Sequence, residues 1–260
     1  MEYLHTGYGG YQEKVNAALS SGNEMESFNV VSSIAKIMSV SYTVARMAIF
    51  NNEKSQILSS TTQIMQSMEG ILKLTANNNK GLVLKANLMV VRSCCPAGYQ
   101  LKFSSNTIES HQKFLTFERY SNGNGIKICL PMPDPSRPDC ALPGAPEATL
   151  MDTDDYSVMN CSRISYRKGV PKTIRKEIEK YFLTATYKSL ISLPLCVMHS
   201  GAPEGIGVVN IESNRGNVLG EGAHKIPGVA KILSPLCLIL ATLVHAENTI
   251  TTKTVKIEEA

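Results

Sequence analysis

Two apolar runs near the end of the chain constrain its fold more than any other segment. Ser189–Val197 and Ile206–Ile211 are rich in β-branched residues and have the length of strands. The polar segment His199–Gly205, which contains two glycines, separates them. A helix-like segment precedes this pair and another follows it. The pattern predicts two neighbouring strands of one sheet with helices packed against it, which is an α+β arrangement.

Composition narrows the class of protein. The chain has 260 residues, enough for one domain with extensions, and 43% of them are apolar, enough for a buried core. The net charge of +4 is too small to indicate nucleic-acid binding. The seven cysteines are irregularly spaced and odd in number, which favours free thiols over a disulfide framework. The first residues show no basic region followed by an apolar one, so we expect a cytoplasmic protein.

Two segments approach the composition of a membrane span. Phe28–Phe50 is long enough, but it carries Lys36, Arg46 and several serines, which are costly in hydrocarbon. Pro235–Val244 is almost entirely apolar, but it is much shorter than the roughly 20 residues that a spanning helix needs. We interpret both as core or dimer helices, and we do not expect an integral membrane protein.

The chain divides into four segments. Residues 1–23 are rich in Gly, Ser, Tyr and Asn and are predicted to be flexible. Residues 24–80 show helical periodicity interrupted at Asn51–Asn52, which predicts a helical pair. Residues 81–248 form the main domain, and residues 249–260 form a tail. The helical pair is either a hairpin packed on its own domain or a bundle for dimerisation or signal relay, and we expect a homodimer through this pair and the terminal helix.

The main domain contains further predicted strands and helices. The strand-like segments are Leu82–Arg92, Tyr99–Phe103, Thr116–Tyr120 and Gly125–Leu130. Pro131–Glu147 is an irregular segment with six prolines, and a loop of that length in a compact domain is often functional. Amphipathic spacing predicts a helix over Val170–Phe182. A terminal helix is predicted from Val229 to about Glu247, and we expect Pro235 to kink or restart it.

Two strand patterns resemble a known family. The segment Lys85–Val90, KANLMV, is typical of the opening strand of GAF domains. Their closing strand carries a G-V-x-N-x-x-S pattern, which this chain matches at Gly207, Val208, Asn210 and Ser213. The chain thus resembles a GAF-like sensor domain over about residues 82–246, with a PAS-like relative as the rival fold. The resemblance implies an antiparallel sheet with helices packed on one face. It also implies a pocket, over which Pro143–Pro146 is either a lid or a rigid surface excursion.

Strand alternation selects four candidate ligand contacts. Phe117 and Arg119 are expected to share one face of their strand, and Asn210 and Glu212 one face of the closing strand. We predict that these four residues line the pocket. Arg119 is then the cation that grips the carboxylate or phosphate of an anionic small molecule with two hydrogen bonds. The alternative for Arg119 is an outward-facing ion pair with Glu118 or Glu212.

No motif of a known catalytic centre accompanies this pattern. The sequence lacks HExxH, a G-x-S-x-G nucleophile elbow and a phosphate-binding glycine loop. Adjacent Cys94–Cys95 suit a redox pair or a soft-metal site, or are simply small side chains at a strand end. Asp152–Asp155 lacks the Gly and the distal Glu of a calcium loop. The basic stretch Arg163–Lys180 is interpreted as a solvated helix face rather than a phosphate-binding surface.

Three functions follow from these observations. The first is a small-molecule-binding regulatory domain without an output enzyme of its own. The second is a structural or interaction module whose pocket is filled by its own side chains. The third is a thiol-dependent enzyme that uses Cys94–Cys95. The sequence indicates no particular cofactor.

Overall fold

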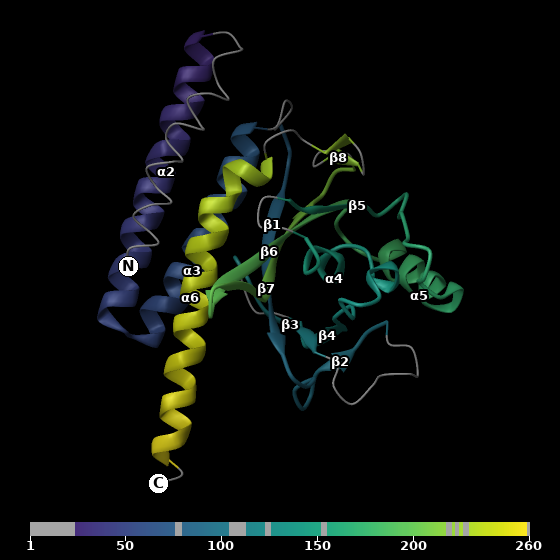
Figure 1. The fold of residues 1–260 in the computed structure, drawn as a ribbon. Helices are drawn as coiled ribbons and strands as arrows, with labels where there is room; N and C mark the ends of the chain where they lie inside the picture. Colours follow the sequence, from purple (N-terminus) through teal and green to yellow (C-terminus); the bar gives the residue numbers. More distant parts are fainter. Residues whose placement is uncertain are drawn as a thin grey trace.

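A seven-stranded sheet forms the centre of the protein (Figure 1). The computed structural model describes residues 24–75, 80–103, 113–122, 126–151, 155–216, 220–221, 224–225 and 229–258. The strands of the sheet are β1 (Leu84–Arg92), β2 (Gln100–Leu101), β3 (Phe114–Tyr120), β4 (Ile128–Pro131), β5 (Ser157–Asn160), β6 (Ser189–His199) and β7 (Ala202–Ser213). They lie in the order β2-β4-β3-β1-β7-β6-β5. A separate ribbon pairs β8 (Gly220–Glu221) with β9 (His224–Lys225).

The helices cover both faces of this sheet (Figure 1). They are α2 (Glu24–Asn51), α3 (Lys54–Thr75), α4 (Ala145–Ala148), α5 (Lys172–Leu183) and α6 (Val229–Glu258), with a short 3-10 turn at Pro138–Cys140. Helices α3 and α6 lie directly on one face, and α2 packs on these two helices from outside. We call this side the helix face. Helices α4 and α5 lie on the opposite side, which we call the pocket face.

The predicted α+β class is confirmed, but the architecture differs from the expectation in two respects. All neighbouring strands of the sheet are antiparallel except β2 and β4, which pair in parallel, so the sheet is mixed. Helices occupy both faces instead of one. The short edge strand β5 was also missed, because four residues carry too little periodicity to be recognised. The predicted flexible segment, residues 1–23, lies outside the described residues.

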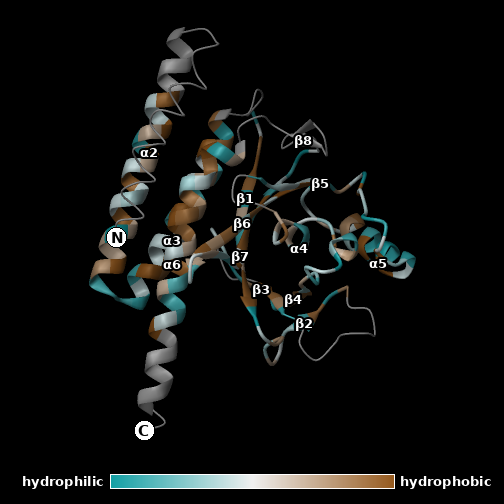
Figure 2. Cartoon of the chain, viewed as in Figure 1, coloured by the Kyte–Doolittle hydropathy of each residue, from teal (hydrophilic) through white to brown (hydrophobic). Residues whose placement is uncertain are grey.

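The helix face is closed by apolar side chains from every layer. Alternate residues of the strands point to this side, among them Leu88, Leu193 and Ile211, and each of these is almost completely buried. Helix α6 meets them with Leu236 and Leu240. Figure 2 shows apolar residues along α3 and α6 and along the strands on which these helices pack. This face therefore supplies most of the hydrophobic stabilisation.

Helix α6 is apolar on more than one side because it lies between the sheet and two other helices. Among the described residues, only its segment Ala230–Ile250 has the length and hydropathy of a membrane span, and 50% of its most apolar window is buried inside the protein. The core helix of a folded domain has the same properties. Helix α6 continues through Pro235, so of the two outcomes expected there, a kink or a restart, the restart does not occur.

The predicted pairing of the two closing strands is confirmed. β6 and β7 form one antiparallel hairpin, in which His199 pairs with Ala202. The turn consists of only Ser200 and Gly201, both with positive φ values, 50° and 84°. This is the backbone geometry that two-residue hairpins favour, and the glycine adopts it without steric cost. The hairpin brings Asn210 and Glu212 of β7 to the middle of the sheet, next to β1.

A β-bulge interrupts the pairing of β3 with β1. Leu88 pairs with Arg119 and Met89 pairs with Phe117, so Glu118 is an extra residue without a partner on β1. An extra residue reverses the inward and outward alternation beyond it. Phe117 consequently lies on the pocket face and Arg119 on the helix face.

Candidate ligand-binding pocket

A cavity of about 70 Å³ lies between the pocket face of the sheet and α5. Apolar side chains make up most of its wall. The lining residues from the sheet include Asn87, Met89, Phe117, Tyr120, Met159, Leu190, Asn210 and Glu212. The opposite wall includes Leu142, Pro143, Ala145, Pro146, Ile178, Tyr181, Phe182 and Tyr187. A mainly apolar cavity with a few polar groups is the usual form of a small-molecule site.

Four buried polar side chains form a chain of hydrogen bonds across the floor of this cavity. Ser192 Oγ donates to Asn210 Oδ1 at 2.6 Å, and Asn210 Nδ2 donates to Asn87 Oδ1 at 2.8 Å. Asn87 Nδ2 then donates to Glu212 Oε1 at 2.8 Å. Each amide nitrogen carries two hydrogens, so one N–H of each asparagine is not used in this chain. The chain fixes these side chains in place and leaves them able to contact a ligand.

Glu212 is the charged group at the end of this chain, and only 9% of its surface is exposed. Burial raises the pKa of its carboxyl to about 7, although the nearby Lys85 ammonium and the hydrogen bond from Asn87 both act in the opposite direction. Among the described residues no donor bonds to its second oxygen, Oε2. Because Glu212 lines the cavity, this oxygen is available to a bound molecule.

Three tyrosines line the same cavity as Glu212, namely Tyr120, Tyr181 and Tyr187. Burial is the main cause that raises their pKa values, and the negative charge of Glu212 raises each of them further. Tyr120 is also the register partner of Asn87, which bonds Glu212, so its ring lies beside the hydrogen-bond chain. Tyr120 packs against Phe117 at 4.8 Å between ring centroids, which continues the aromatic wall along β3.

Two lysines lie near the cavity from different sides. Lys85 is the register partner of Glu212 on β1, and its ammonium lies 3.4 Å from the centroid of the Tyr120 ring. Lys102 lines the cavity from the segment that follows β2. Both side chains are only partly buried, whereas Glu212 is buried.

The irregular segment before β5 closes one side of the cavity through α4. Gly144 has a φ of 83°, which favours glycine, and it lets the chain enter α4 directly above Leu190. Glu147 of α4 is held by Arg167 Nε at 2.8 Å and by Ser157 Oγ at 2.8 Å. The predicted lid residues Pro143, Ala145 and Pro146 line the cavity. This segment therefore forms part of the cavity wall, and Glu147 attaches it to the rest of the domain through one ion pair and one hydrogen bond.

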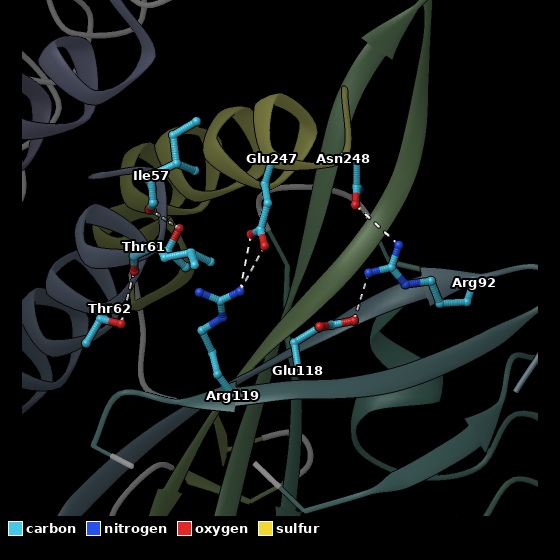
Figure 3. Close-up of polar contacts among 9 residues, drawn as sticks. Ile57, Thr61, Thr62, Arg92, Glu118, Arg119, Glu247 and Asn248 are labelled. Carbon is cyan, nitrogen blue, oxygen red and sulfur yellow. Dashed lines mark hydrogen bonds and ion pairs between the residues drawn. The ribbon is translucent and has the colours of Figure 1, made fainter. Parts of the chain in front are cut away.

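Three of the four predicted site residues lie together and one does not. Phe117, Asn210 and Glu212 line the cavity. Arg119 lies on the other side of the sheet, where its Nη2 contacts both carboxylate oxygens of Glu247 in α6 at 3.2 Å (Figure 3). The prediction assumed regular alternation along β3, and the bulge at Glu118 breaks it. Arg119 is therefore not part of the candidate site, and its partner is neither Glu118 nor Glu212.

The other chemical candidates lie apart from this cavity or have structural partners. All seven cysteines are free thiols, with Cys94 exposed and Cys95 partly buried. Within the described residues, no cluster of three His, Cys, Asp or Glu side chains could hold a metal ion. In the basic stretch, Arg175 Nε donates to the carbonyl of Val170, and Arg167 holds Glu147. Of the acidic run, Asp152 and Asp154 lie outside the described residues.

Sequence reasoning missed the tyrosines and Asn87. Asn87 belongs to the recognised strand pattern, and a polar amide in the middle of an apolar strand signals a buried hydrogen bond. Tyr181 and Tyr187 flank the end of α5, where no pattern connects them to β7. Only the folded chain brings these two residues to Glu212.

The fold and the cavity define an α+β protein with an internal, mainly apolar pocket that contains one buried carboxylate. Neither the family models nor the curated proteins that were searched contain a match to this sequence.

Proposed function

We propose that this chain is a cytoplasmic, GAF-like regulatory protein that binds a small molecule and has no output enzyme of its own. Two features of the fold support the GAF-like assignment. The five strands β3-β1-β7-β6-β5 are consecutive in the sheet and antiparallel. The two strands with the family-like patterns, β1 and β7, are paired at its centre.

The observation that carries the proposal is the combination of an unfilled cavity with a fixed polar floor. A cavity of about 70 Å³ would be costly in a protein with no use for it, because its walls lose packing contacts. Buried polar groups also cost free energy unless each finds a partner. In the hydrogen-bond chain from Ser192 to Glu212, three members (Asn87, Asn210 and Glu212) line this cavity and keep polar groups that the chain does not use. The unfilled cavity and its polar floor both support the binding of a ligand there.

A route from the cavity to the helices is available through β3. Phe117 lines the cavity, and two residues later Arg119 is paired with Glu247 of α6. Glu118, between them, is paired with Arg92, and Arg92 Nη1 also donates to Asn248 of α6 at 3.3 Å (Figure 3). A ligand that presses on Phe117 would thus bias two polar contacts with one helix. In the proposed mechanism, ligand binding shifts α6 between two arrangements.

Native mass spectrometry of the full chain purified from its host tests this proposal. We expect a bound small molecule that is released on unfolding, and stabilisation of the emptied protein when that molecule is returned. The variant Ala145→Leu adds side-chain volume at the cavity wall and should abolish both results. As a matched control, Ala202→Leu on the exposed hairpin should change neither. An empty protein that no metabolite stabilises would instead favour a structural or interaction module whose cavity binds nothing.

The thiol-dependent alternative makes a different prediction. An enzyme using Cys94–Cys95 would lose turnover on alkylation, whereas ligand binding in the cavity should survive it because neither cysteine lines the wall.

A further inference from the structure

One corner of the cavity has the composition of a cation-binding site. Glu212 is a buried carboxylate that lines the cavity, and in the described part of the chain no donor bonds to its Oε2. Tyr120, Tyr181 and Tyr187 line the same cavity, and Tyr120 is the register partner of Asn87, which bonds Glu212. The face of a tyrosine ring is electron-rich and attracts ammonium groups, and a nearby carboxylate adds a full negative charge.

The protein itself places an ammonium group at this corner. The Lys85 Nζ atom lies 3.4 Å from the centroid of the Tyr120 ring, within the range of a cation–π contact. Lys85 is not among the residues that line the cavity, and no ion pair joins it to Glu212 in the described part of the chain. In this part of the chain the carboxylate therefore has no cationic partner within ion-pair distance, although it lines the cavity.

We propose that the pocket takes a small organic cation, whose ammonium group binds between Glu212 and the three tyrosines and whose apolar part contacts Met89 and Leu190. This inference rests on the proposed function and names the chemical class of its ligand. It reverses the anionic ligand expected from sequence, because that expectation depended on Arg119, which lies across the sheet.

Burial decides between a cation and an anion. The charged groups near the cavity are Glu212, Lys85 and Lys102, so the net formal charge alone would favour an anion. The two lysines are partly exposed, however, and solvent screens their fields. Glu212 is buried, so solvent screens its negative charge much less, and a bound cation would stabilise its ionised form. An anion in this corner would also have to approach an unpaired carboxylate.

The size of the cavity limits the ligand. A volume of about 70 Å³ holds roughly five water molecules, at about 10–15 Å³ for each. Choline and short alkylammonium ions are therefore suitable probes, and larger cations would require α4 to move.

Calorimetric titration with matched probes tests the inference. Choline is compared with its neutral carbon isostere, in which a tert-butyl group replaces trimethylammonium, and butylammonium is compared with butyrate. We expect each cation to bind at least about tenfold more tightly than its partner. Glu212→Gln should remove this preference, and Tyr120→Leu should weaken it independently if Glu212→Gln fails to fold. Glu118→Gln, on the helix face, is the matched control and should leave the preference intact.

Substitution of Lys85 tests whether the pocket prefers a positively or a negatively charged ligand. Lys85→Met keeps the apolar stem but removes a positive charge beside the site, so affinity for choline should stay the same or rise about two- to threefold. A site for anions would lose affinity in the same variant.

The outcomes separate this inference from the proposed function. Binding of butyrate or of the neutral isostere as tightly as the cations overturns the cationic ligand and leaves a ligand-binding protein. No binding of either cation also overturns it, while a molecule retained in native mass spectrometry would still support the proposed function. If no probe binds and no molecule is retained, both proposals fail.

Discussion

The two faces of the central sheet use the same strands for opposite purposes. On the helix face, side chains of β1, β6 and β7 meet α3 and α6 in one continuous apolar core. On the pocket face, alternate residues of the same strands include Asn87, Asn210 and Glu212, which line a cavity, and Ser192, which donates to Asn210. One face is filled and the other is incompletely filled.

The two faces therefore contribute differently to the stability of the fold and to the choice of ligand. A packed apolar face lowers the free energy of folding without selecting any ligand. Buried polar groups contribute less to stability, but their geometry can discriminate between ligands. Substitutions on the helix face should therefore change the free energy of unfolding, and substitutions on the pocket face should change recognition.

The largest effect is expected from a pair of leucines in one strand. Leu193 of β6 lies in the helix-face core, whereas Leu190 of the same strand lines the cavity. Leu193→Ala should lower the free energy of unfolding by about 3 kcal/mol, because it opens a new cavity in a filled core. Leu190→Ala should cost about half as much, because its neighbours already border empty space. Urea denaturation at unchanged m-value measures both, and equal costs would contradict the comparison.

The second-largest effect on stability is expected from the buried carboxylate of Glu212, and it depends on pH. Because the folded-state pKa of Glu212 is raised to about 7, the folded protein holds its proton more tightly than the unfolded chain does. The stability of the wild type should therefore fall as pH rises from about 4.5 to about 7, and it should remain at the lower level above pH 7. Glu212→Gln should remove up to about 3 kcal/mol of this loss, at about 1.4 kcal/mol per pKa unit.

Denaturation curves at pH 5 and pH 8 measure this difference. Glu212→Gln should be more stable than the wild type at pH 8 and gain much less at pH 5. The negative charge of Glu212 also raises the pKa values of Tyr120, Tyr181, Tyr187 and Cys161, so these groups stay neutral in this interval. The exposed Glu204→Gln is the control and should show no such pH-dependent gain. A gain equal at both pH values would mean that Glu212 is not buried as an acid.

A smaller effect is expected from the polar contacts between β3 and α6. Arg119 and Glu247 are 19% and 18% exposed, so their ion pair is shielded from solvent. A double-mutant cycle with Arg119→Met and Glu247→Gln should give a coupling energy of about 1 kcal/mol. The ion pair of Arg92 with Glu118 is more exposed and should couple by roughly half as much. Neither single change should remove the preference for choline over its neutral isostere, and loss of that preference in Arg119→Met would return Arg119 to the site.

The smallest effect on stability is expected at the outer surface of α2, a third environment that touches neither face of the sheet. Met47 and Phe50 are 59% and 80% exposed there. We propose that this surface contributes to a homodimer. The double variant with Met47→Glu and Phe50→Glu should have a free energy of unfolding within about 0.5 kcal/mol of the wild type. It should also convert the dimer to a monomer in light scattering. A wild type that is already monomeric at high micromolar concentration would refute the dimer.

Much of the fold could be predicted because its signals are local. The periodicity of α3, the amphipathic spacing of α5 and the β-branched runs of β6 and β7 are each contained within one segment. The candidate site was predicted only in part. Phe117, Asn210 and Glu212 follow from strand alternation, whereas Tyr181 and Tyr187 reach the cavity through contacts between segments that have no shared pattern.

The error at Arg119 has a different origin. The sequence F-E-R-Y around Glu118 contains no residue that predicts a bulge. The bulge depends on how β3 pairs with β1, which is a property of two segments and not of one. A prediction that assumed perfect alternation therefore assigned the right residue type to the wrong side of the sheet.

The single extra residue at Glu118 also determines which changes of length β3 can tolerate. Deletion of Glu118 would remove the bulge, but Phe117 would still lie opposite Met89 on the pocket face and Arg119 opposite Leu88 on the helix face. The loss would be confined to the ion pair of Glu118 with Arg92. In descendants of this chain, a gap at this position is therefore compatible with the same pocket, whereas a gap elsewhere in β3 would turn the residues beyond it to the other face.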